Sequence, residues 1–233
     1  DVREEYTYNT GGGERNDLIG VHGQKDGTNF VGLNVLVGRM GADDVLELAD
    51  LAEEYGSGEV RLSQRQNVIV TDVPDSELDD FLAEPLLEHY SPDPSPFMRG
   101  SVACTGTEFC SLSIVETKNR QVRYARWLKE NVDLPGDVEE FHIHLSGCTA
   151  SCAQPQIADV SLRGMKTRKN GEAVEALDFG LGGGLGSEPQ FARWVTQRVP
   201  VDEVPGGLAN LIESFAAQRD DGEGFREFVA RHD

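Results

Sequence analysis

Apolar positions in the first part of the chain follow two different periods, which predict short strands mixed with helices. Residues 30–37 form an apolar run typical of a strand, and apolar residues recur at helical spacing over residues 42–56. Two more strands are predicted over Val60–Leu62 and Val68–Thr71, on either side of a polar turn. A second helix is predicted over residues 75–89. This order is that of a small α+β half-domain with one strand unplaced.

A proline-rich stretch, residues 91–96, follows this half-domain, and proline suits neither a helix interior nor a central strand. Residues 1–27 are polar and glycine-rich and are predicted to be a leader or linker. We predict an α+β protein with a half-domain over residues 28–92 and a second domain over residues 95–233. In the second domain the pattern predicts strands over 101–103, 141–145, 157–162 and 174–181 and helices over 108–131, 204–218 and 225–231.

The chain is strongly acidic, with 41 acidic and 21 basic residues and a net charge of −20. A nucleic-acid partner is not expected, because neutralising phosphates requires a surplus of cations. Acidic and apolar residues are interspersed, as in residues 77–82, which favours a folded chain over a disordered one. Self-repulsion should weaken the fold at moderate salt and fade at about 1 M salt, where the Debye length is about 3 Å. The composition resembles that of proteins from halophiles.

No apolar run approaches the roughly 20 residues that span a bilayer. The first residues also lack the basic and apolar regions of a signal peptide. We therefore predict a soluble, cytoplasmic protein with no membrane partner.

The four cysteines fall in two pairs, Cys104 with Cys110 and Cys148 with Cys152. Three interpretations are open. Two disulfides would suit a secreted protein rather than the cytoplasmic one predicted here. Structural zinc favours gaps of two residues within a pair, whereas these gaps are of five and three residues. A [4Fe–4S] cluster is larger than one zinc ion and accepts wider gaps between its four thiolate ligands.

The residues around the cysteines favour the cluster. Gly106, Gly147 and several small neighbours let the backbone approach a bulky inorganic core. Backbone N–H groups in such loops hydrogen-bond to cluster sulfides. A helix that begins near Glu108 would place its positive N-terminal end beside Cys110 and favour the thiolate form.

Several blocks of sequence carry a further signal. Residues 103–110 read ACTGTEFC and residues 144–154 read HLSGCTASCAQ. The other blocks lie at 21–25, 30–33, 37–39, 55–62, 84–87, 90–92, 114–120, 157–160 and 181–186. In content and order they resemble the sirohaem and iron–sulfur family of nitrite and sulfite reductases, and most closely its ferredoxin-dependent nitrite reductases. The resemblance extends from about residue 18 to the end of the chain.

The resemblance implies a ferredoxin-like half-domain followed by an α/β domain that binds sirohaem and a [4Fe–4S] cluster. It implies six-electron reduction of nitrite to ammonia, with reduced ferredoxin as the electron donor. Sulfite reduction to sulfide is the close alternative. A non-catalytic electron-transfer or zinc-stabilised module is the alternative from a different class.

The resemblance also assigns roles to residues. It makes all four cysteines cluster ligands, and the thiolate of Cys152 also bridges to the sirohaem iron as the catalytic cysteine. Sirohaem carries many carboxylates, so cationic and amide side chains suit its pocket. The candidates are Arg61, Gln66, Asn67, Lys118 and Arg120. For residues 61–67 the alternative is a solvated turn between two strands.

The sequence departs from the family in two respects. Thr149 and Ala150 stand where the family commonly has proline and asparagine, so one amide contact to the cofactor is expected to be absent. The chain is also about half as long as family members and begins with Asp1 rather than methionine. We expect it to be a C-terminal half, whose substrate-gripping cations come from a missing N-terminal half or a partner subunit.

Two groups of cations and two histidines complete the candidates. One predicted helix places cations along one side, where they would dock an acidic ferredoxin or form a solvated face: Arg120, Arg123, Arg126 and Lys129. A second group has the same two interpretations: Arg163, Lys166, Arg168 and Lys169. His142 and His144 share one face of a strand, and a hydrogen-bonded structural role is favoured over metal binding or proton relay.

Overall fold

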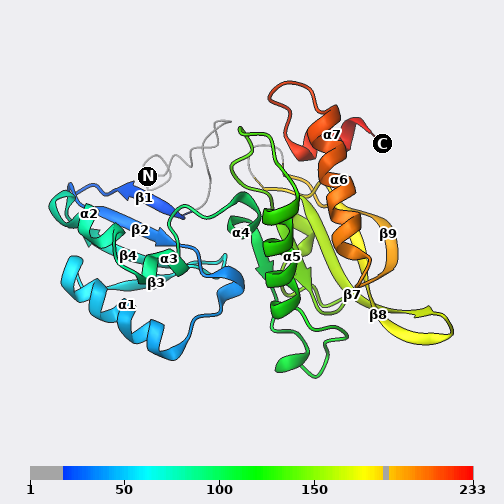
Figure 1. The fold of residues 1–233 in the computed structure, drawn as a ribbon, viewed down its shortest axis with the longest axis horizontal. Coiled ribbons are helices and arrows are strands. Elements are labelled where there is room, and N and C mark those ends of the chain that lie inside the picture. Colours follow the sequence, from blue (N-terminus) through cyan, green and yellow to red (C-terminus); the bar gives the residue numbers. More distant parts are fainter. Residues whose placement is uncertain (1–17, 186–188, 233) are drawn as a thin grey trace, which may run out of the picture.

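The computed structural model describes residues 18–185 and 189–232, which form two domains lying side by side (Figure 1). Each domain has its own sheet and its own buried apolar cluster. The mixed α+β class predicted from the sequence is confirmed. Within these ranges, no helix has the length and apolar character needed to cross a membrane.

The first domain is a four-stranded antiparallel sheet with helices packed against it. The strand order is β1-β2-β4-β3, with β1 at Gly20–Gly23, β2 at Asn29–Leu33, β3 at Val60–Leu62 and β4 at Val68–Val73. The helices are α1 (Ala42–Tyr55), α2 (Asp75–Leu82) and α3 (Leu86–His89). Leu33 of β2, Leu48 of α1 and Phe81 of α2 belong to one buried cluster that holds these layers together.

The second domain is a five-stranded sheet in the order β5-β6-β7-β8-β9. Its strands are β5 (Ser101–Ala103), β6 (Ile143–Ser146), β7 (Val160–Lys169), β8 (Glu172–Leu181) and β9 (Arg193–Pro200). The first three strands are parallel and the last two antiparallel, so the carboxyl ends of β5, β6 and β7 lie at one edge. The helices are α4 (Pro96–Arg99), α5 (Lys118–Asn131), α6 (Val204–Gln218) and α7 (Phe225–Arg231).

Three differences from the expected elements lie in the first domain. The strand expected over residues 30–37 ends at Leu33, and the chain turns through the 3-10 segment η1 (Leu36–Gly38). The helix expected over residues 75–89 is split into α2 and α3, because Pro85 cannot continue a helix interior. The unplaced strand is β1, which pairs with β2, so part of the expected leader belongs to the sheet. Residues 1–17 of that leader lie outside the described residues.

Two further differences lie in the second domain. The helix expected over residues 108–131 begins only at Lys118, where the Glu116 carboxylate accepts the N–H groups of Asn119 and Arg120 at 2.8 and 3.0 Å. Cys110 therefore lies in a loop, after the short 3-10 segment η2 (Gly106–Glu108), and not at a helix N-terminus. Strand β9 was not predicted, whereas the helices over residues 204–218 and 225–231 are confirmed.

Phe215 of α6 is fully buried in the second domain, and its ring centroid lies 5.3 and 5.4 Å from those of Phe225 and Phe228. We expect Phe215→Ala to lower the free energy of unfolding by about 3–5 kcal/mol, because truncation removes these contacts and leaves a cavity. Phe191→Ala is the matched control, since Phe191 is 76% exposed, and should change it by less than about 0.5 kcal/mol. Urea unfolding at high salt measures both, and equal losses would contradict this account of the core.

Candidate functional site

The two cysteine pairs lie in loops that leave the carboxyl ends of neighbouring parallel strands. Cys104 directly follows β5, and Gly147 and Cys148 directly follow β6. The Cys104 N–H donates to the Leu145 carbonyl at 3.1 Å, and the Gly147 N–H donates to the Cys104 Sγ at 3.1 Å. The second contact is of the kind that stabilises a thiolate ligand. The fold thus joins two loops that are far apart in the sequence.

Two glycines allow this close packing. The Ile114 N–H donates to the Gly147 carbonyl at 2.8 Å, and a Cβ on Gly147 would lie 1.9 Å from the Ser113 Oγ. Gly106 has a φ of +71°, and a Cβ there would lie 2.4 Å from the Thr117 Oγ1. That hydroxyl donates to the Cys104 carbonyl at 2.6 Å. The two glycines therefore let the cysteine loops pack closely against Ser113 and Thr117.

The loop that carries Cys148 and Cys152 is fastened to buried polar side chains of the sheet. The Ser146 Oγ accepts the Ala153 N–H at 3.0 Å, and the Ser161 Oγ donates to the Pro155 carbonyl. The His144 Nδ1 lies 3.2 Å from the Gln154 carbonyl. The sequence predictions missed the anchoring role of Ser146 and Ser161. Both are 1% or less exposed, which only the fold reveals, so no signal in the sequence marks them.

All four cysteines are free thiols; three are partly buried and Cys152 is exposed. Across residues 18–185 and 189–232, no three His, Cys, Asp or Glu side chains converge on a point where one metal ion could sit. A [4Fe–4S] cube takes one thiolate at each of four irons, so its ligands need not converge in this way. The two joined loops and the N–H donor at the Cys104 sulfur suit a ligand of such a cluster.

Of the polar candidates, Gln66 and Lys118 lie beside the cysteine loops. The Gln66 Nε2 donates to the Ala103 carbonyl at 2.8 Å, one residue before Cys104. The Lys118 Nζ donates to the Val37 carbonyl, and burial followed by the charge of Arg39 lowers the pKa of Lys118.

The other three candidates are engaged within the protein. Arg61 is exposed and pairs with Glu59 at 2.7 Å. Asn67 is buried, and its Oδ1 accepts the N–H of Val35 at 2.9 Å.

Arg120 is also buried, so it does not belong to an exposed cationic side of α5 as expected. It pairs with Glu175 and donates to the Glu116 carbonyl at 3.0 Å. The remaining members of that group, Arg123, Arg126 and Lys129, are exposed.

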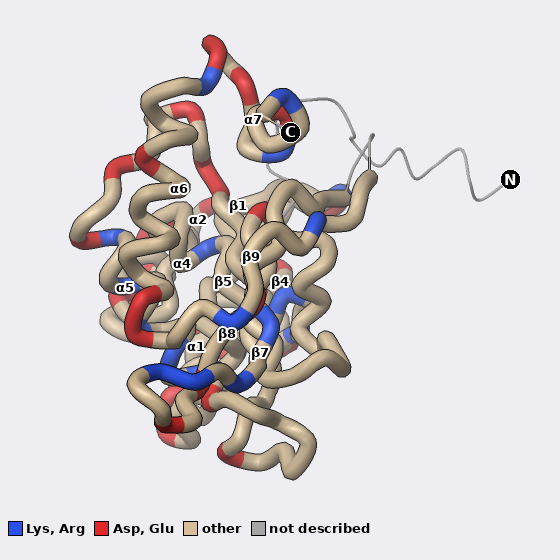
Figure 2. Tube along the Cα trace, turned by 90° about the vertical axis from the view of Figure 1, so that its right-hand side faces the viewer, with Lys and Arg blue, Asp and Glu red and all other residues tan. Residues whose placement is uncertain are grey.

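The second cationic group lies on β7, near β8 (Figure 2). Arg163 is engaged there, because it pairs with Asp178 at 3.0 Å and lies 4.0 Å from the ring centroid of Trp194. Lys169 pairs with two carboxylates of the segment before α6, and Lys166 and Arg168 are exposed.

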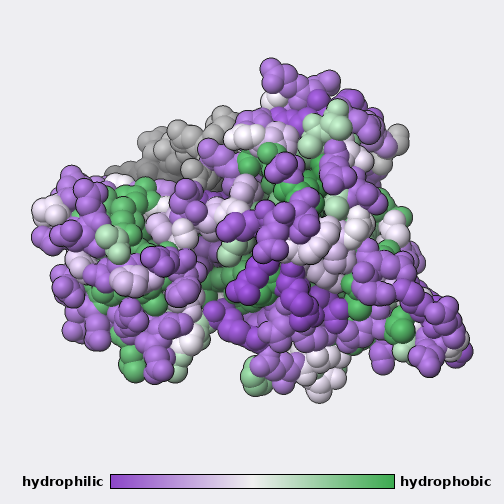
Figure 3. Space-filling model, viewed as in Figure 1, coloured by the Kyte–Doolittle hydropathy of each residue, from purple (hydrophilic) through white to green (hydrophobic). Residues whose placement is uncertain are grey.

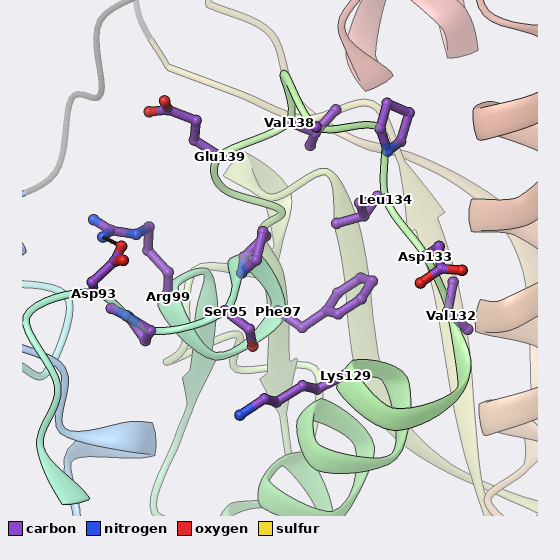
Figure 4. Close-up of a pocket in the computed structure, with 14 residues that line it drawn as sticks. Asp93, Ser95, Phe97, Arg99, Lys129, Val132, Asp133, Leu134, Val138 and Glu139 are labelled. Carbon is purple, nitrogen blue, oxygen red and sulfur yellow. Dashed lines mark ion pairs between the residues drawn. The ribbon is translucent and has the colours of Figure 1, made fainter. Parts of the chain in front are cut away.

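The surface is hydrophilic over most of the face in Figure 3, in keeping with the net charge of −20. Phe109 and Leu112, which flank Cys110, are nevertheless 80% and 73% exposed. A cavity of about 300 Å³ lies elsewhere, between the linker before α4 and the loop after α5 (Figure 4). It adjoins the C-terminal end of α5, whereas the cysteine loops adjoin the N-terminal end, so it is a separate feature.

A cluster of charged groups joins the two domains at the start of β6, the opposite end of that strand from Cys148. The His142 Nδ1 lies 3.3 Å from Asp159 and its Nε2 lies 3.2 Å from Glu140. Arg65, from the turn between β3 and β4, lies 3.2 Å from Glu140 and 2.8 Å from the His142 Nε2. Two carboxylates thus face two cationic groups.

These contacts set the charge of both histidines. Burial alone would lower the pKa of His142, but Asp159 and Glu140 outweigh it and raise the pKa to about 9. Burial would likewise raise the pKa of Glu140, but His142 and Arg65 lower it to about 2. Burial, followed by the charge of His142, lowers the pKa of His144 to about 3. Hence His142 is charged and His144 neutral at pH 7. His144 is hydrogen-bonded only through Nδ1, because its buried Nε2 has no partner within the part of the chain that the structure describes.

Two sequence models of protein families match this chain. The model described as Nitrite/Sulfite reductase ferredoxin-like half domain matches residues 22–87. The model described as Nitrite and sulphite reductase 4Fe-4S domain matches residues 95–232, which are more than half of the chain. These ranges correspond to the two domains of the structure.

Curated relatives and a solved structure agree with these matches. An assimilatory ferredoxin-dependent nitrite reductase of Haloferax mediterranei is 58% identical over 98% of this chain and 40% of its own length. A ferredoxin–nitrite reductase of Synechococcus elongatus is 47% identical over 88% of this chain and 40% of its own. The structure of the Mycobacterium tuberculosis NirA protein matches with a TM-score of 0.83 and 33% identity, over 92% of this chain and 40% of that one. The chain thus spans about 40% of the length of these proteins.

The raised pKa of His142 makes stability depend on alkaline pH. Its contribution is complete below about pH 6.5, the unfolded value, and is lost as pH rises through the folded value of about 9. Between pH 7 and 9 the wild type should lose roughly 2 kcal/mol of unfolding free energy from this group, and His142→Gln should lose much less. His89→Gln, an exposed histidine, should keep the wild-type slope. Urea unfolding across this range measures the slopes, and parallel curves for wild type and His142→Gln would contradict the assignment.

Proposed function

Because this chain belongs to the nitrite and sulfite reductase family, we propose that it is the cluster- and sirohaem-binding part of a ferredoxin-dependent nitrite reductase. The proposed reaction is the six-electron reduction of nitrite to ammonia, with reduced ferredoxin as the donor. Residues that grip nitrite would come from the rest of the protein or from a partner subunit.

The observation that carries this proposal is the meeting of the two cysteine loops at the carboxyl edge of β5 and β6. Ligands from both loops are then available to one cofactor. The Gly147 N–H would stabilise the charged form of Cys104, as backbone donors do at iron–sulfur sites.

Each cysteine has a proposed role at this edge. Cys104, Cys110, Cys148 and Cys152 would hold the [4Fe–4S] cluster, which together with sirohaem would supply the electron-transfer chemistry of the reduction. Cys152 is proposed to bridge the two groups, and its exposure leaves its sulfur accessible to a second cofactor. The cation of Lys118, beside Cys104, would offset negative charge of the thiolates.

The exposed cations of α5 are proposed to attract the donor. Arg123, Arg126 and Lys129 form a basic surface on a chain of net charge −20, and ferredoxin would bring acidic groups to it. Arg120 takes no part, since it is buried against Glu175.

The protein purified without oxygen at high salt should contain five irons per chain, four in the cluster and one in sirohaem, with four sulfides and the absorption bands of sirohaem. Cys152→Ser should lose most of the cluster and the magnetic coupling between cluster and haem, because one sulfur would serve both. Thr149→Ala, an exposed neighbour that leaves every thiol in place, is the control and should retain both signals. Metal analysis and EPR measure these outcomes. Stoichiometric zinc in a colourless protein would contradict the proposal and favour a zinc-stabilised module.

The substrate is tested on the native polypeptide that contains this chain. With reduced ferredoxin, nitrite should yield ammonia at a kcat/KM at least about tenfold above that for sulfite reduction to sulfide. A preference for sulfite would reassign the reaction within the same family, and absence of both activities in protein with both cofactors would leave an electron-transfer module.

A further inference from the structure

We propose that Gln66 is a positioning residue, which holds Cys104 in place from the neighbouring domain. The inference rests on the proposed function, in which Cys104 is a cluster ligand. It departs from the family resemblance, which suggests that Gln66 contacts the macrocycle itself.

The Gln66 amide completes the open edge of the second sheet. β5 is the edge strand, and its other neighbour is β6. The Gln66 Nε2 donates to the Ala103 carbonyl at 2.8 Å, and its Oε1 accepts the Ala103 N–H at 3.4 Å. One side chain therefore satisfies both backbone groups of Ala103, as a further strand would.

The backbone around Gln66 is built to aim this amide. Gln66 has a φ of +66°, in a turn closed by a 3.2 Å bond from its N–H to the Ser63 carbonyl. Gly38 lies against it, and a Cβ there would come within 2.8 Å of the Gln66 Cβ. Lys118 donates to the carbonyl of Val37, beside that glycine, and so ties the same segment to the start of α5.

The hydrogen bonds of Cys104 itself come from its own domain. Its N–H donates to the Leu145 carbonyl and its carbonyl accepts the Thr117 hydroxyl. Its Sγ accepts the Gly147 N–H and lies 3.9 Å from the Thr117 Oγ1. Gln66 adds the contact from the other domain, at the residue directly before. Its loss should therefore loosen Cys104 more than the cysteines of the second loop.

The test compares Gln66→Met, which keeps the length but removes both hydrogen bonds, with Gln64→Met, an exposed glutamine in the same turn. In the full chain without cluster, iodoacetamide labelling followed by mass spectrometry gives a rate for each cysteine. We expect Gln66→Met to label Cys104 about five- to tenfold faster, the effect of losing one net hydrogen bond, because the 3.4 Å contact adds little to the 2.8 Å one. Cys148 and Cys152 should stay within about twofold. Gln64→Met should match the wild type.

Equal rates at Cys104 in the two variants, or an equal rise at all four cysteines, would overturn the proposal. Should Gln66→Met fail to fold by circular dichroism, hydrogen exchange of the wild type decides: the Ala103 N–H should be protected although it faces the open edge, and rapid exchange there would overturn the proposal. The labelling is done without cofactor, so it tests the role of Gln66 independently of cluster binding. If the wild type binds no cluster, that result contradicts the proposed function and not the role of Gln66.

The same two variants loaded with the cluster give a second measurement. Gln66→Met should alter the EPR line shape or midpoint potential of the reduced cluster, since both respond to ligand orientation and hydrogen bonding, while Gln64→Met should not. Unchanged spectra together with unchanged labelling would leave Gln66 with no positioning role.

Discussion

The parallel pairing of β5 with β6 is the constraint on which the site depends. Parallel strands end at the same edge, so Cys104 and Cys148 emerge side by side although a helix and a long loop separate them in the sequence. The hydrogen bond from Gly147 to the Cys104 sulfur, the glycine contacts between the loops and the serine anchors of the second loop all presuppose that arrangement. A different strand order would leave the cysteines as two unrelated pairs.

Much of this architecture could be predicted from the sequence, because the signals are local. Helical spacing over residues 42–56 and 204–218 identified α1 and α6 nearly to the residue. The cysteine spacing indicated a cofactor, and the order of the sequence blocks indicated the family, which the two family models confirm. Such features are encoded within a few residues of one another and do not require knowledge of the fold.

What could not be predicted depends on contacts between distant residues. The start of α5 is set by the Glu116 carboxylate, and the burial of Arg120 is set by Glu175 on a strand far along the chain. Strand β1 forms because it pairs with β2, whereas the glycine-rich sequence of β1 by itself gives little indication of a strand. Ser146 and Ser161 read as ordinary polar residues until the loop they anchor is seen to fold over them.

The edge of β5 also bears on how such proteins can be recombined. The proline-rich linker at residues 91–96 is the natural point at which to exchange one domain for that of a relative. A crossover there would separate Gln66, and the Gly38 that packs against it, from the strand whose edge Gln66 completes. A first domain taken from a relative would have to carry a matching turn and a matching glycine. The segment that can be exchanged without loss is therefore larger than either domain, because it includes the interface between them.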